Sequence, residues 1–89
     1  MQFTWHEPKR QANLEKHGMD FADAAQVFAG PTFTFKADRE DYGEQRWIML
    51  GLLVEKVLVI VHTETEDEIR VISMREADKD EQLLFFTNL

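Results

Sequence analysis

The sequence predicts an α+β fold, in which two N-terminal helices pack on one face of a mainly antiparallel sheet. Two observations support this prediction. Apolar residues recur with the period of a helix before residue 31 and with the two-residue period of a strand after it. Strand-like segments then follow one another at hairpin spacing, which favours antiparallel neighbours. The expected order of elements is β-α-α-β-β-β-β-α.

The first strand is expected at residues 3–5, and a helix follows from residue 7 to about residue 18. Pro8 fits the first turn of this helix, and Gly18 suits the left-handed residue that closes it. Asp20 can cap a second helix, which runs to about Phe28. We expect the two helices to bury five apolar residues on the sheet: Leu14, Phe21, Ala24, Ala25 and Phe28.

The second half of the chain reads as four strands and a last helix. Phe and Thr alternate over residues 32–36, as in a half-buried strand, and a polar loop follows at 37–45. Segments 46–52 and 57–63 have apolar residues on both faces, so we expect them at the centre of the sheet, joined by a connection at 53–56. Segment 68–74 follows an acidic turn. The last helix lies within 75–89 and makes its apolar contact through Leu83, Leu84, Phe85 and Phe86.

Length and composition predict a single domain over residues 1–89, located in the cytoplasm. The chain has 44% hydrophobic residues and no cysteine, so disulfides and thiolate chemistry are excluded. The N-terminus has no signal pattern, and no apolar run approaches the roughly 18 residues of a membrane span. The net charge of −7 argues against general affinity for nucleic acid. Three arginines in or beside strands nevertheless leave room for a cationic strip: Arg46, Arg70 and Arg75.

The residue types that could carry chemistry form a generic set, and metal-free RNA cleavage needs little more than these. His6, His17 and His62 lie far apart in the sequence, and the glycines stand singly, so neither a metal, a cofactor nor a phosphate-binding loop is expected. There remain four candidates on the strands and two at the end of the first helix: Arg46, His62, Arg70, Arg75, Lys16 and His17. A histidine can move protons for a ribose 2′-hydroxyl that attacks phosphorus, while arginines stabilise the phosphate. The ordinary alternative is that these arginines form surface salt bridges.

Three stretches of the chain carry a resemblance to a known family. The sequences FTWHEPKRQANLEKHGMDFADAAQVF, DYGEQRWIMLG and VLVIVHTETEDEIRVISMREA resemble the BrnT family of bacterial toxins over nearly the whole chain. The resemblance implies a RelE-like fold and an endoribonuclease that cuts RNA and halts translation. It also implies a ribbon-helix-helix antitoxin of the BrnA type, through which the complex would bind operator DNA. The family's proposed site residues correspond to Lys16, His17, His62, Arg70 and Arg75, and RNA binding would involve Arg46, Arg70 and Arg75.

The chain also departs from the family pattern. His6 stands where the family has an acidic residue, and Met74 replaces an alanine. The final helix lacks the family's basic run, and Phe85 stands where a tyrosine is expected. This acidic, apolar tail suits contact with a partner better than contact with RNA. A non-catalytic module that keeps antitoxin binding but has lost RNA cleavage is therefore the alternative function.

Overall fold

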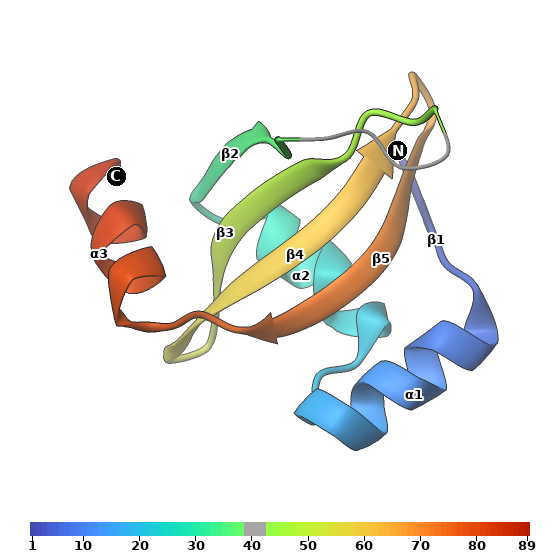
Figure 1. Ribbon diagram of the computed structural model, residues 1–89, viewed down its shortest axis with the longest axis horizontal. Coiled ribbons are helices and arrows are strands. Elements are labelled where there is room, and N and C mark those ends of the chain that lie inside the picture. The colour runs from blue at the N-terminus through green and yellow to red at the C-terminus, as the bar shows by residue number, and fades with distance from the viewer. Residues whose placement is uncertain (39–42) are drawn as a thin grey trace.

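The computed structural model describes residues 1–38 and 43–89, and its centre is a five-stranded sheet (Figure 1). The strand order is β1-β5-β4-β3-β2, with β1 parallel to β5 and every other pair antiparallel. The strands are β1 (Gln2–Thr4), β2 (Thr32–Lys36), β3 (Trp47–Leu53), β4 (Lys56–Glu64) and β5 (Glu68–Glu76). The predicted α+β class and the central position of β3 and β4 are confirmed.

Within residues 1–38 and 43–89, three α-helices accompany the sheet, and the predicted closing residue of the first is confirmed. They are α1 (Glu7–His17), α2 (Ala24–Phe28) and α3 (Lys79–Thr87). Gly18 closes α1 in the left-handed conformation, at φ 69°, and its N–H donates to the carbonyl of Leu14. The Asp20 side chain accepts from the N–H of Ala22, so its predicted capping role is confirmed. The helix it caps is a short 3-10 turn that precedes α2.

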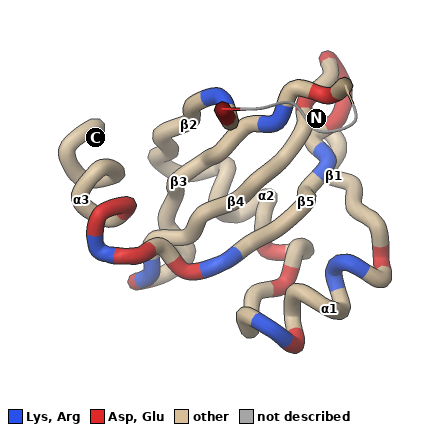
Figure 2. Tube along the Cα trace, viewed as in Figure 1, with Lys and Arg blue, Asp and Glu red and all other residues tan. Residues whose placement is uncertain are grey.

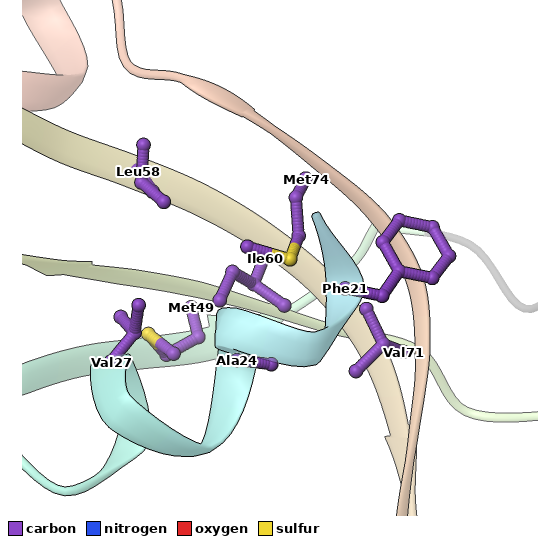
Figure 3. Close-up of a cluster of buried hydrophobic side chains, with 8 residues drawn as sticks. All are labelled: Phe21, Ala24, Val27, Met49, Leu58, Ile60, Val71 and Met74. Atoms are coloured by element: carbon purple, nitrogen blue, oxygen red, sulfur yellow. The ribbon is translucent and has the colours of Figure 1, made fainter. Parts of the chain in front are cut away.

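The core on one face of the sheet is formed by the 3-10 turn, α2 and three strands (Figure 3). Phe21, Ala24 and Val27 are fully buried there. They meet the inward side chains of the strands: Met49, Leu58, Ile60, Val71 and Met74. Two predicted core residues were wrong, because Leu14 and Ala25 are exposed. The 3-10 turn has a three-residue period, so Val27 takes the buried position expected for Ala25.

The opposite face of the sheet carries a second core with α3. Phe85 is fully buried against Leu50, Val57 and Val59, and Ala77 completes the cluster. The prediction that Leu83, Leu84 and Phe86 also make this contact was wrong, since all three are exposed. Among its apolar side chains, α3 turns Phe85 alone toward the sheet. Its remaining apolar side chains therefore face solvent.

The connection between β3 and β4 is tighter than the predicted four residues. Leu53 pairs with Lys56, so Val54 and Glu55 alone form the turn. Val54 has a positive φ of 58° and is 83% exposed. This conformation is unfavourable for a β-branched residue. The predicted loop at 37–45 lies partly outside the described residues, since 39–42 are not described. Within the described ranges, no helix is both long and apolar enough to cross a membrane.

Candidate functional site

Helix α1 is held against the outer edge of β5 by one buried side chain. Strand β1 pairs only with the first residues of β5, up to Arg70, and leaves the rest of that edge open. The Asn13 side chain donates to the carbonyl of Met74 at 2.8 Å and accepts from its N–H at 3.2 Å. It also donates to the carbonyl of Met19 at 3.0 Å. Asn13 therefore takes the place of a strand neighbour and fixes α1 beside β5.

A bulge interrupts β5 opposite α1. Val61 pairs with Ser73 and His62 pairs with Val71, which leaves Ile72 as an extra residue on β5. A bulge bends its strand and changes the direction of the side chains that follow. In a regular strand, residues five apart lie on opposite faces. The register here instead pairs Arg70 with Thr63 and Arg75 with Val59, so the bulge brings both arginines to the same face.

Between α1 and β5 the surface contains two adjoining pockets, which we call the α1–β5 cleft. The first has a volume of about 330 Å³ and is lined by His6, Lys9, Glu44, Arg46, Arg70, Val71 and Ile72. The second has a volume of about 280 Å³ and is lined by Lys9, Ala12, Asn13, Lys16, His17, Ile72 and Ser73. Lys9 and Ile72 line both pockets, so the two hollows form a continuous depression with several cations along it.

Four of the six predicted site residues line this cleft. Arg46 and Arg70 line the first pocket, while Lys16 and His17 line the second. Figure 2 shows basic positions along α1 and β5 on a chain that carries many acidic ones. Arg70 donates to the carboxylate of Glu44 at 2.6 Å, and each side chain keeps about 40% of its surface exposed. A partly exposed ion pair contributes little stability, so an incoming anion can compete with Glu44 for Arg70.

Arg75 forms an ion pair with Glu81 at the start of α3, outside the cleft. Both of its terminal nitrogens donate to the Glu81 carboxylate at 2.7 Å, and Glu81 in turn completes the capping box of α3 with Asp78. Hydrogen bonds from Arg75 hold the pKa of Glu81 below its usual range, and Glu81 raises the pKa of Arg75. Arg75 is not among the residues that line the cleft. Its described role is to join β5 to the start of α3.

His62 lies in the core, away from the cleft. Its side chain has no exposed surface, and its ring meets the Phe28 ring edge to face at 5.0 Å. Nε2 lies 2.8 Å from the Glu64 carboxylate, and Nδ1 has no hydrogen-bond partner among the described residues. The register places His62 on the face opposite Arg70, because Arg70 pairs with Thr63, the residue that follows His62 on β4. His62 therefore lies apart from the predicted site residues that line the cleft.

Three polar or charged residues of the first pocket were not predicted as site residues: His6, Lys9 and Glu44. Lys9 lies in the first turns of α1 and His6 immediately precedes the helix. Both line the pocket beside β5, where Asn13 bonds α1 to the strand. Glu44 follows the undescribed residues and lies two positions before Arg46. Glu44 lies in the stretch DYGEQRWIMLG that carries the family resemblance, but it was not among the residues predicted for the site. Contact with Arg70, which is 26 residues away, identifies it.

Among residues 1–38 and 43–89, no group of three or more His, Cys, Asp or Glu side chains is arranged to hold a metal ion. A family model described as the ribonuclease toxin BrnT of a type II toxin-antitoxin system matches residues 5–81. No curated protein matches the sequence.

Proposed function

Because the chain belongs to the BrnT family of ribonuclease toxins of type II toxin-antitoxin systems, we propose that it cuts RNA in the α1–β5 cleft. The observation that carries this proposal is the gathering of cations there. Arg46, Arg70 and Lys9 line one pocket, and Lys16 with His17 lines the other, on a chain with a net charge of −7. A local positive hollow on an acidic molecule directs a polyanion to one place.

The proposed reaction is metal-independent cleavage by the neighbouring ribose 2′-hydroxyl. Arg70 and Arg46 bind the phosphate and stabilise the negative charge that develops in the transition state. Lys16 and His17 bind the adjacent part of the RNA backbone. His62 cannot touch RNA from its buried position, so we assign it a structural role in this proposal. Arg75 likewise has a structural role in this proposal, because its ion pair with Glu81 holds the start of α3. It would bind RNA only after that ion pair breaks.

The proposed partner is an antitoxin that neutralises the chain. Membership of the family implies such a partner and an RNA substrate. We propose that the antitoxin is a ribbon-helix-helix protein of the BrnA type, that DNA is bound only through it, and that the toxin has a RelE-like fold. Cleavage would then halt translation in the cytoplasm. The exposed apolar side chains of α3, Leu83 and Phe86, support contact with a partner protein.

The test is cleavage of RNA by the purified chain in the presence of a chelator. The expected products end in a 2′,3′-cyclic phosphate and a 5′-hydroxyl. Arg70→Ala should reduce the rate by about 100-fold or more, in line with the loss of a charge-stabilising group. Arg10→Ala is the matched control, because Arg10 pairs with Glu7 and Asp20 outside the cleft. This variant should cut RNA at the wild-type rate. A folded wild-type chain that leaves RNA intact would refute the proposal.

One observation favours a second candidate, a binding module without catalysis. Arg70 and Arg75 each form a short ion pair, with Glu44 and Glu81, so part of the positive charge is already neutralised. Such a module would form a tight complex with the antitoxin and leave RNA uncut at every salt concentration. Detection of a cyclic phosphate product would exclude it.

A further inference from the structure

We propose that Glu44 and His6 are the general base and the general acid of the RNA cleavage. The inference rests on the proposed function and names two catalytic residues for it. Among the described residues that line the first pocket, Glu44 is the one carboxylate and His6 the one imidazole. They lie with Arg46 and Arg70, the residues that would hold the phosphate.

Glu44 is positioned to accept a proton once the substrate has displaced it from Arg70. Its carboxylate accepts from Arg70 at 2.6 Å, and its side chain is about 40% exposed, so RNA can reach it. When a phosphate takes over Arg70, the carboxylate loses its partner and remains beside the bound phosphate. A free carboxylate at this position can accept the proton of the adjacent 2′-hydroxyl.

His6 is placed as a proton donor in the same pocket. It occupies the N-cap position of α1, yet its side chain makes no capping hydrogen bond. The imidazole is exposed and is therefore not committed to holding the helix. The charged groups that line the pocket with it come from every neighbouring element: Lys9 of α1, Arg46 and Glu44 before β3, and Arg70 of β5. An imidazolium at this position can protonate the leaving oxygen.

The proposed step is balanced. The 2′-hydroxyl gives its proton to the Glu44 carboxylate, and the 2′-oxygen forms a bond to phosphorus. The bond from phosphorus to the 5′-oxygen breaks, and that oxygen takes a proton from the His6 imidazolium. The products are a 2′,3′-cyclic phosphate and a 5′-hydroxyl. Exchange with water returns one proton from Glu44 and one to His6, so neither a metal nor a co-reactant is consumed.

The experiment measures kcat/KM for a short RNA against pH with wild type, Glu44→Gln and His6→Gln. Wild type should give a bell-shaped profile, since Glu44 must be ionised and His6 protonated. Glu44→Gln should lower kcat/KM by about 100-fold and remove the acidic limb, and His6→Gln should remove the alkaline limb. Free imidazole should restore part of the activity of His6→Ala. Glu76→Gln is the matched control, because Glu76 pairs with Lys56 away from the pocket.

The outcomes separate this inference from the function on which it rests. A folded wild type that yields no cyclic phosphate overturns both. If wild type cuts RNA and the pH profile of Glu44→Gln or His6→Gln is the same as that of wild type, the assignment of the acid–base pair is overturned. The proposed ribonuclease activity then still stands. If Glu44 only masks Arg70, Glu44→Gln should bind RNA more tightly and cut faster, which also overturns the pair. Each variant is checked for folding by its thermal transition.

Discussion

The substitution Asn13→Ala should loosen α1 from the sheet and open the cleft. The side chain of Asn13 is buried and makes three hydrogen bonds, two with Met74 and one with Met19. Truncation leaves the N–H and the carbonyl of Met74 without their partner at the edge of β5. An unsatisfied buried polar group costs about 1–3 kcal/mol, and water can recover part of that cost. We therefore expect the free energy of unfolding to fall by about 2–4 kcal/mol.

The assay is unfolding in denaturant, followed by RNA binding under conditions where the variant stays folded. Small domains have a free energy of unfolding of about 5–15 kcal/mol, so most molecules of the Asn13→Ala variant should remain native. RNA binding should nevertheless weaken, because Lys16 and His17 are no longer held opposite β5. Gln11→Ala is the control, since Gln11 bonds only to the exposed Glu7 on the same helix. Equal stability and equal RNA binding for the two variants would refute the anchoring role of Asn13.

Three further predictions follow from the described contacts. His62→Gln should lower the temperature of the thermal transition and leave kcat/KM of the folded fraction unchanged, because His62 is fully buried away from the cleft. A selective loss of kcat would instead show that the role of His62 is catalytic. The pKa of Glu81 is depressed by Arg75, so the stability that Glu81 provides is present at neutral pH and is lost as the pH falls through its lowered value. Denaturation at a series of pH values should show that Glu81→Gln loses less stability on acidification than wild type, by less than about 1 kcal/mol; parallel curves would contradict this. Gly51→Ala should destabilise the chain by about 1–3 kcal/mol in denaturant titrations, because the new methyl group would meet Val27 Cγ1 at 2.6 Å, and an unchanged midpoint would contradict that contact.

The strands and the helix ends could be predicted because their causes are local. Alternation of Phe and Thr identifies β2, and the left-handed preference of Gly18 ends α1 whatever lies beyond it. The buried face of α2 could not be predicted in the same way. The three-residue period of the preceding 3-10 turn, which the sequence does not announce, replaces Ala25 with Val27. The sequence of α3 likewise does not show which of its four apolar residues meets the sheet, and in the structure it is Phe85.

The candidate site could be predicted only in part, because its geometry depends on register. Lys16, His17, Arg46 and Arg70 were identified by residue type and do line the cleft. The bulge at Ile72 then decides which face each side chain of β5 takes, and no residue pattern marks it. It separates His62 from Arg70. Glu44 was missed because its partner is distant in sequence and close only after the sheet has formed.

The anchoring of α1 on β5 also has a consequence for synthesis on the ribosome. Asn13 and Met74 are 61 positions apart, so one wall of the cleft is translated long before the other. A nascent chain that has not yet extruded β5 has an α1 with nothing to dock on, and this helix is too short to be stable by itself. The positive hollow therefore arises only when translation of this sequence is nearly complete. Truncated products that end before β5 therefore lack this hollow.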